Sequence, residues 1–276
     1  MLGPELLEGT PLRCGEIAMT GPPAGERKGA ECALRASERA QRIRDEKAAW
    51  EQELAAWTHE KDPWSLEVSR NSKHMHPRQM LRELEKAMPA DAMVSTDIGN
   101  VCSVSNSYLR FERPRSMFAA MSFGNCGYAF PVICGAKFAA PERPAIAYVG
   151  DGAWGISFNE LLTCAREEIG VTAVVFNNGQ WGAEKKNHVD FFSQRFQGVN
   201  LVNPSWAGVA RAFGCEGVTV DRLQDVGPAL QASVEAQREG RCTVLEMMVT
   251  QELGDPFRRD ALAKPVRYLE KYKSYE

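Results

Sequence analysis

The larger part of the chain alternates between short apolar runs and segments with apolar residues at helical spacing. Continuous apolar runs are typical of strands buried on both faces, whereas apolar positions three to four residues apart are typical of helices packed on one face. The predicted strands are 93–96, 117–120, 145–149, 171–176, 218–220 and 242–249, and the predicted helices are 77–88, 101–110, 127–140, 158–168, 205–213 and 223–238. Because strands that alternate with helices form parallel sheets, we expect an α/β fold with a doubly wound, mainly parallel sheet flanked by helices.

The pattern upstream of this region is different. Residues 1–30 are rich in glycine, proline and charge and show no periodicity, so we expect them to be poorly ordered. From residue 31 to residue 59 an apolar stripe at helical spacing predicts a linker helix, followed by a polar connector. The expected organisation is an N-terminal segment (1–30), a linker helix and connector (31–76), a main domain (77–252) and a charged, aromatic tail (253–276).

Polar motifs follow two consecutive predicted strands at the point where each strand ends. Gly150-Asp151-Gly152 closes one strand, and after 24 intervening residues Asn177-Asn178 closes the next. Mg²⁺ prefers about six oxygen ligands, and carboxylate, amide and phosphate oxygens can supply them. The glycines let the backbone approach closely, and N–H groups after Gly152 can bind an anion. Each motif alone is an ordinary turn signal, but together at the carboxyl ends of two strands they predict a site for Mg²⁺ and a diphosphate.

Two further glycine-bearing loops are predicted at strand ends. The first contains Gly99 and Asn100, and the second is the segment 122–128 (SFGNCGY). Either loop alone is weak support, because strand-to-helix turns often contain glycine and asparagine. With the two motifs described above, they place four loops at one edge of the sheet.

Basic residues after the second motif leave two interpretations open. Lys185 and Lys186 lie either on a solvated helix face or in an anion-recognition patch, for which Arg195 and the pair Arg258-Arg259 are further candidates. His188 is a candidate for proton transfer.

Composition excludes several classes of function. The net charge of -3 provides no general attraction to nucleic acid or to an anionic membrane, and no apolar run approaches the about 18 residues that span a bilayer. The N-terminus lacks the pattern of a secretory signal. The 8 cysteines contain no C-x-x-C pair, which argues against a zinc site or an iron–sulfur cluster and favours a reducing cytoplasm.

The GDG motif followed by NN resembles the signature of thiamine-diphosphate-dependent enzymes. Longer stretches from about residue 39 onward resemble the sulfoacetaldehyde acetyltransferase family, among them HPRQMLRELEKAMP, SFGNCGYAFP, YVGDGAWG, QWGAEKKNHVDF and ELGDPFRRDAL. SFGNCGYAFP and QWGAEKKN distinguish this family from relatives similar to acetolactate synthase. The resemblance implies the thiamine-diphosphate-binding fold, with thiamine diphosphate and Mg²⁺ as cofactors. It also implies the conversion of sulfoacetaldehyde and phosphate to acetyl phosphate and sulfite, a step of sulfonate catabolism.

The same resemblance implies roles for individual residues. The metal ligands would be Asp151, the side chain of Asn178 and the backbone carbonyl of Gln180. The carbonyl of Gly124 would accept from the 4′-amino group of the cofactor, and Cys126 would stand where a bulkier apolar residue often supports the bent cofactor. The full set of expected cofactor-binding residues is Gly99, Asn100, Gly124, Asn125, Cys126, Gly150, Asp151, Gly152, Ala153, Asn178, Gln180 and Gly182.

No catalytic residue is assigned outright. The reaction implied by the resemblance requires the binding of two anions, a sulfonate and a phosphate, so Lys185, Lys186 and Arg195 remain candidates together with His188.

The resemblance covers only a C-terminal part of the family's length. Members of the family also carry a middle domain and an N-terminal pyrimidine-binding domain, whose glutamate activates the cofactor, and residues 1–76 resemble neither. We therefore expect a domain that is inactive alone, receives a pyrimidine-binding domain from another chain and forms a homo-oligomer. Two alternatives stay open: the small subunit of a two-subunit thiamine-diphosphate decarboxylase, and a non-catalytic truncated remnant.

Overall fold

A computed structural model describes residues 26–59 and 73–251. The predicted linker helix is present as α1 (Glu26–His59), which ends where the sequence predicts but begins earlier than residue 31. The expectations for residues 1–25, for most of the connector and for the tail lie outside the described residues. The chain divides into two compact units between Ala55 and Ala56, and the second unit carries the sheet.

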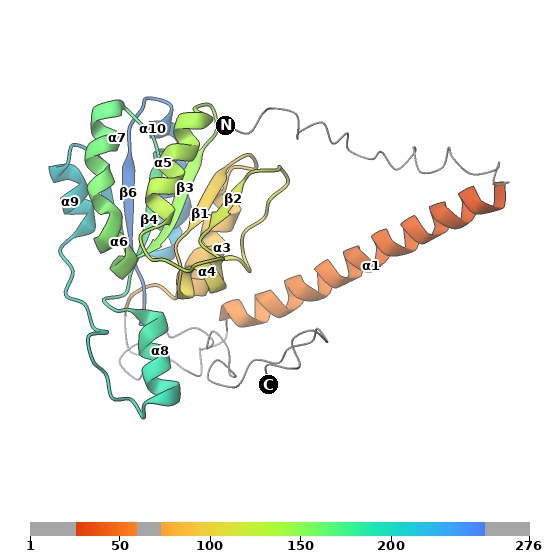
Figure 1. Cartoon of the computed structure of the whole chain (residues 1–276), viewed down its shortest axis with the longest axis horizontal. Helices are drawn as coiled ribbons and strands as arrows, with labels where there is room; N and C mark the ends of the chain where they lie inside the picture. The colour runs from red at the N-terminus through yellow and green to blue at the C-terminus, as the bar shows by residue number, and fades with distance from the viewer. Residues whose placement is uncertain (1–25, 60–72, 252–276) are drawn as a thin grey trace, which may run out of the picture. The chain divides into compact units, whose positions relative to one another are not determined.

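Six parallel strands form one sheet in the order β2-β1-β3-β4-β6-β5, which confirms the predicted parallel α/β architecture (Figure 1). The central strands are buried along nearly their whole length, as their apolar sequences predict. The strand bounds are β1 (Met93–Thr96), β2 (Met117–Ala119), β3 (Ala145–Gly150), β4 (Thr172–Asn177), β5 (Glu216–Val220) and β6 (Thr243–Met248).

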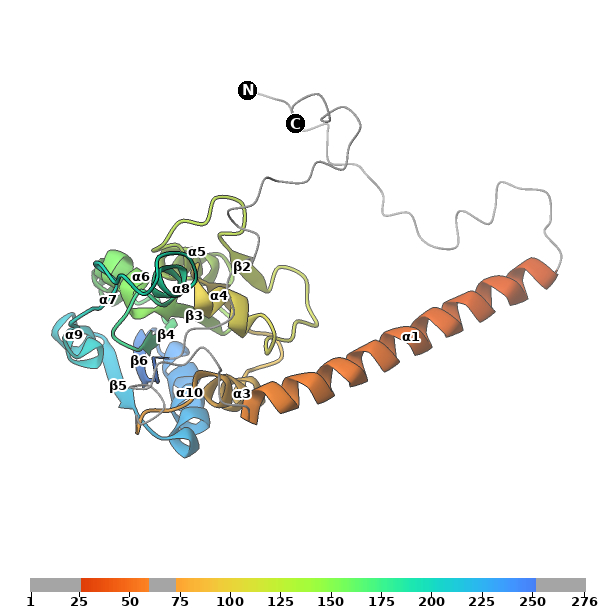
Figure 2. The same ribbon diagram turned by 90° about the horizontal axis from the view of Figure 1, so that it is seen from below.

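Helices cover both faces of the sheet, as Figures 1 and 2 show together. On one face lie α5 (Ala129–Ala139), α6 (Asp151–Ser157) and α7 (Leu161–Glu167), and on the other lie α3 (Pro77–Ala87) and α10 (Leu223–Gln237). The remaining helices are α4 (Asn100–Ser105), α8 (Gly182–Phe191) and α9 (Trp206–Ala212), with a short 3-10 turn at Phe158–Glu160.

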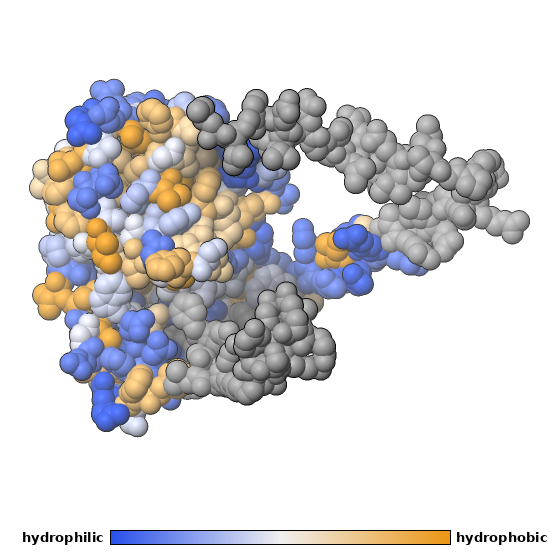
Figure 3. Space-filling view, in the orientation of Figure 1, coloured by the Kyte–Doolittle hydropathy of each residue, from blue (hydrophilic) through white to orange (hydrophobic). Residues whose placement is uncertain are grey.

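Aromatic side chains pack together on the face of the sheet that α5, α6 and α7 cover. Trp154 is fully buried between the sheet and its neighbours, with ring centroids 4.8 Å from Phe130 and 6.5 Å from Trp206. The surface over α5, α6 and α7 is partly apolar, and exposed side chains there include Phe138, Ile156 and Leu162 (Figure 3).

At two places in the main domain, the helices differ from their predicted bounds by more than two residues. The helix predicted at 158–168 is preceded by α6, which begins at Asp151 itself, because burial of Trp154 overrides the low helical propensity of the glycines around it. The helix predicted at 101–110 runs only from Asn100 to Ser105.

Candidate functional site

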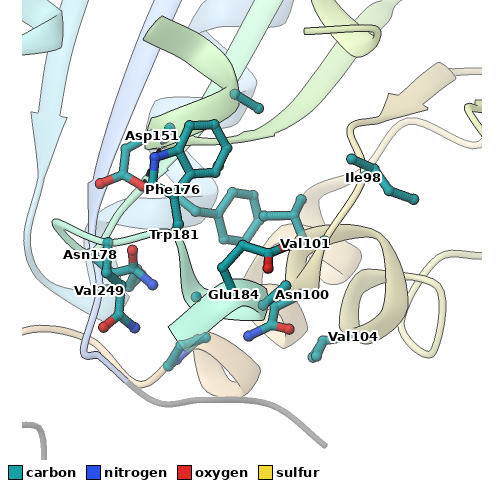
Figure 4. Close-up of a pocket in the computed structure, with 18 of the residues that line it drawn as sticks. Ile98, Asn100, Val101, Val104, Asp151, Phe176, Asn178, Trp181, Glu184 and Val249 are labelled. Carbon is teal, nitrogen blue, oxygen red and sulfur yellow. Dashed lines mark hydrogen bonds between the residues drawn. The ribbon is translucent and has the colours of Figure 1, made fainter. Parts of the chain in front are cut away.

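A cavity of about 220 Å³ lies at the carboxyl ends of the central strands. Its lining includes all the expected cofactor-binding residues except Asn125, which is exposed. Figure 4 shows side chains from three of the four predicted loops facing this cavity, with Asp151 on one side, Asn178 below it and Asn100 across from them. The parallel sheet therefore brings together four loops that are far apart in the sequence, as predicted.

Asp97 joins the first two of these loops. Its fully buried carboxylate accepts hydrogen bonds from the backbone N–H groups of Ile98 at 3.0 Å, Gly127 at 3.1 Å and Ala129 at 3.0 Å. Burial raises the pKa of Asp97, and these hydrogen bonds oppose the rise. The sequence interpretation did not assign Asp97 a role, although its position directly after a strand resembles that of Asp151.

The glycines of these loops adopt conformations that other residues reach only with strain. Gly99 has φ 104° and Gly124 has φ 77°, both in the region that favours glycine. The backbone can therefore turn sharply at both points and still line the cavity.

The two principal motifs meet at the carboxylate of Asp151. This residue is 2% exposed and opens α6, and its Oδ2 accepts hydrogen bonds from the N–H of Gly179 at 2.7 Å and from Nδ2 of Asn203 at 2.6 Å. Its Oδ1 accepts from the N–H of Gly152 at 3.0 Å. Burial raises the pKa of Asp151, and the bond from Asn203 is the largest opposing influence. No signal in the sequence pointed to Asn203.

Backbone hydrogen bonds hold the loop of the second motif against a neighbouring segment. The N–H of Trp181 donates to the carbonyl of Val199 at 2.8 Å, and the N–H of Leu201 donates to the carbonyl of Gly179 at 2.8 Å. The indole ring of Trp181 then lies so close to Gly152 that an added Cβ would meet ring atoms at 2.8 Å. Glycine is required at that position by close approach.

Buried polar atoms in the cavity lining have no hydrogen-bond partner among the described residues. They are Nδ2 of Asn100 and both polar atoms of the Gln180 side chain. Buried polar groups are normally paired, so these atoms fit a polar ligand such as a diphosphate or a metal-bound water. Within the described residues no cluster of three His, Cys, Asp or Glu side chains could hold a metal. One carboxylate with amide and carbonyl oxygens suits Mg²⁺ better than a softer ion.

Lys185 and Lys186 are buried, at 4% and 2% exposure, so the interpretation of a solvated helix face is wrong. Lys186 forms an ion pair with Asp190, and Nζ of Lys185 donates to Oδ1 of Asn200 at 2.9 Å and lies 5.4 Å from the ring centroid of Phe196. Burial lowers the pKa of Lys185. Neither side chain lines the cavity, because α8 turns this pair toward its own neighbours.

The other candidates for catalysis also lie outside the cavity lining. His188 is half-buried against the rings of Phe192 and Phe196, at centroid distances of 5.9 and 6.3 Å. Arg195 is exposed and its Nε donates to the carbonyl of Phe192. The pair at 258–259 lies outside the described residues. The cationic side chain that does line the cavity is Arg78, near the start of α3, which the sequence interpretation missed.

The expectations about membranes and cysteines can be compared with the described residues only. No helix among the described residues is long and apolar enough to cross a bilayer. The six cysteines whose side chains the structure describes are free thiols, namely Cys102, Cys126, Cys134, Cys164, Cys215 and Cys242.

Comparison with known proteins identifies the class. Residues 97–247 match the family model of the thiamine pyrophosphate enzyme, C-terminal TPP binding domain. The chain therefore belongs to the thiamine pyrophosphate enzymes, whose cofactor is also called thiamine diphosphate and is held through Mg²⁺ on its diphosphate.

The chain is also similar to individual proteins. The chain is 65% identical over 250 residues to sulfoacetaldehyde acetyltransferase of Castellaniella defragrans, and 60% identical over 254 residues to the protein of that name from Alcaligenes xylosoxydans xylosoxydans. Each match covers 88% of this chain and 42% of the relative, so the chain spans about two fifths of the length of these curated relatives. Benzoylformate decarboxylase from Polynucleobacter necessarius has a TM-score of 0.60 at 21% identity, covering 71% of this chain and 36% of that one, which shows the shared fold.

Proposed function

We propose that this chain supplies the Mg²⁺- and diphosphate-binding domain of a sulfoacetaldehyde acetyltransferase, which converts sulfoacetaldehyde and phosphate to acetyl phosphate and sulfite. The observation that carries the proposal is the hydrogen bond from the N–H of Gly179, which directly follows Asn178, to Asp151 of the first motif. This bond lies beside a cavity whose lining contains polar side-chain atoms with no partner among the described residues. The similarity to two acetyltransferases supports the choice of reaction within the family.

The residues of the cavity divide into those that hold the metal and those that hold the organic part of the cofactor. Asp151, the side chain of Asn178 and the carbonyl of Gln180 would hold Mg²⁺, and the loop with Gly99 and Asn100 would bind the diphosphate, as would the N–H groups that begin α6. When bound, thiamine diphosphate stabilises the carbanion that the reaction requires. The chain's own residues orient the cofactor and exclude water around it.

The second loop would hold the aminopyrimidine. In this proposal the carbonyl of Gly124 would accept from the 4′-amino group, and Cys126, half-buried in the cavity lining, would support the cofactor. Burial raises the pKa of the Cys126 thiol, so this side chain acts as a small neutral surface.

In this proposal Arg78, rather than Lys185 or Lys186 of α8, is the candidate for binding an anionic substrate. It is the cation in the cavity lining formed by the described residues, whereas Lys185 and Lys186 are buried elsewhere. A guanidinium can bind a sulfonate or a phosphate through two parallel hydrogen bonds. Arg78→Lys should therefore raise the KM of an anionic substrate more than it lowers kcat, and Arg78→Gln should raise it further.

The proposal includes a pyrimidine-binding domain from another chain, which supplies the activating glutamate, and assembly into a homo-oligomer in the cytoplasm. The apolar surface over α5, α6 and α7 supports association with another protein surface (Figure 3). The free thiols fit a reducing compartment.

Two measurements test this function. Calorimetry should detect Mg²⁺-dependent binding of thiamine diphosphate that Asp151→Ala abolishes and Asp221→Ala, a change at an exposed carboxylate, leaves intact. Sulfite release from sulfoacetaldehyde and phosphate should appear only when the pyrimidine-binding part of a relative is added. Turnover by the chain alone would contradict the need for a partner. Cofactor binding without sulfite release in the complemented mixture would favour the decarboxylase subunit or the non-catalytic remnant.

A further inference from the structure

Asn203 connects the proposed metal site to polar groups outside the cavity lining. Its Nδ2 donates one hydrogen bond to Oδ2 of Asp151 at 2.6 Å and another to Oδ1 of Asn177 at 3.0 Å. A side-chain amide carries two N–H hydrogens, so both hydrogens of Asn203 are used.

The next members of this chain of hydrogen bonds are Asn177 and Glu246. Asn177 is 8% exposed and its Nδ2 donates to Oε1 of Glu246 at 2.8 Å. The two adjacent asparagines thus do different things, because Asn178 lines the cavity while Asn177 binds this buried carboxylate. Glu246, on β6, is 3% exposed and accepts four more hydrogen bonds, from the N–H groups of Trp206 and Ala207 and from the hydroxyls of Ser205 and Thr219.

The donors around Glu246 fix the direction of every bond in the chain. Backbone N–H groups can only donate, so both oxygens of Glu246 must accept. Asn177 must therefore turn its NH₂ group toward Glu246 and its oxygen toward Asn203. Asn203 must then donate at both contacts, and its NH₂ group is presented to Asp151. The reverse orientation would place an amide oxygen against the Asp151 carboxylate.

We propose that Glu246, Asn177 and Asn203 form a positioning chain for the metal site, in which a distant carboxylate sets the orientation of the Asp151 carboxylate. The chain engages Oδ2 of Asp151, the oxygen that also accepts from Gly179. These two hydrogen bonds form a clamp between the two motifs, and Asn203 itself lies outside the cavity lining. This inference rests on the proposed role of Asp151 as a metal ligand. Groups that orient metal ligands typically change metal affinity by about 10- to 100-fold when they are removed.

The first test measures the hydrogen bond from Gly179 to Asp151 directly and needs no cofactor. Amide hydrogen exchange in the full chain should be faster at Gly179 in Asn203→Leu by about tenfold or more, because Asp151 loses the group that holds it as acceptor. Amides within β4 should keep their protection. The matched control is Asn159→Leu, an exposed asparagine on the 3-10 turn, which should change neither.

The second test reads the metal site. In Asn203→Leu the Mg²⁺ concentration for half-maximal thiamine diphosphate binding should rise by about 10- to 100-fold. Glu246→Gln introduces a donor where five donors already point, so it should act in the same direction. Circular dichroism at the temperature of measurement establishes that each variant is folded, and Asn203→Leu decides the result if Glu246→Gln is not.

The outcomes separate this inference from the proposed function. Unchanged exchange at Gly179 in Asn203→Leu overturns the positioning chain, whatever the cofactor does. If the Gly179 amide exchanges faster in Asn203→Leu but at the wild-type rate in folded Glu246→Gln, then Glu246 is not part of the positioning chain. If wild-type protein binds no Mg²⁺-thiamine diphosphate, the proposed function of the isolated chain fails, while the exchange data still decide whether the clamp exists.

Discussion

The substitution Gly152→Ala tests how closely the wall of the cavity is packed. A Cβ at position 152 would lie 2.8 Å from two ring carbons of Trp181 and 2.9 Å from a third. Real Cβ atoms essentially never approach other atoms within 3.0 Å, so the ring must move. The backbone of Trp181 is held by its hydrogen bond to Val199, and the indole is rigid, so the displacement falls on the side-chain torsions.

The magnitude follows from two opposing effects. Replacing glycine by alanine in a helix stabilises by about 0.5–1 kcal/mol, whereas overpacking a closely packed site costs about 1–3 kcal/mol. Gly155, in the same helix, isolates the first effect, because it is exposed and the nearest atom to an added Cβ there is 3.9 Å away. Gly155→Ala should therefore raise the free energy of unfolding by about 0.5–1 kcal/mol. Gly152→Ala should be less stable than Gly155→Ala by about 1–3 kcal/mol.

Urea unfolding followed by circular dichroism measures this difference. The two variants and the wild-type protein should show the same dependence of free energy on urea concentration, so that their midpoints compare stability directly. A Gly152→Ala protein as stable as Gly155→Ala would refute the close contact with Trp181. The physical reason for a glycine at that point of the motif would then be lost as well.

Three further predictions use the same unfolding measurement. Asp97→Asn should lower the free energy of unfolding by about 1–3 kcal/mol, because an amide cannot accept all three backbone N–H groups. The control Asp221→Asn, at an exposed carboxylate, should change the free energy of unfolding by no more than about 0.5 kcal/mol. Equal effects of the two substitutions would contradict this role of Asp97. Burial lowers the pKa of Lys185 from 10.5, so folding disfavours its charged form. The wild-type protein should therefore gain stability relative to Lys185→Met as pH rises through the folded-state pKa toward 10.5, and a constant difference between them would refute this cause. Gly217→Ala would place a Cβ against the backbone carbonyl oxygen of Ala207 and should lower the free energy of unfolding by about 2 kcal/mol or more. The control Gly135→Ala has open space around the added Cβ and should raise the free energy of unfolding by up to about 1 kcal/mol. Similar stabilities of the two variants would contradict the packing at Gly217.

The fold could be predicted well from local patterns. The strands β3 and β4 were located to within a residue, because a strand buried on both faces needs an unbroken apolar run. The position of the site followed from topology, since the carboxyl ends of parallel strands share one edge. That rule brought together loops as distant as Gly99 and Gly182. The roles of these residues as ligands stay predictions.

The failures concern single polar side chains. Lys185 and Lys186 have the sequence of a solvated helix face, yet both are buried. Lys185 bonds Asn200 on another segment, and Lys186 pairs with Asp190 on its own helix. Arg78 lines the cavity although it comes from a helix that precedes the first strand of the domain. A charged residue's surroundings depend on what packs against its helix, and the periodicity of that helix carries no such information.

The sequence alone determined the class of fold, the edge of the sheet where the site lies and the residue types suited to Mg²⁺ and a diphosphate. These properties depend on local patterns and on the chirality of strand–helix–strand connections. Only the tertiary structure decided which polar groups support the site. Asn203 reaches Asp151 across 52 positions of sequence, and Glu246 reaches Asn177 across 69. Hydrogen bonds need particular distances and directions between individual atoms, and such geometry arises only after the sheet and its helices have packed.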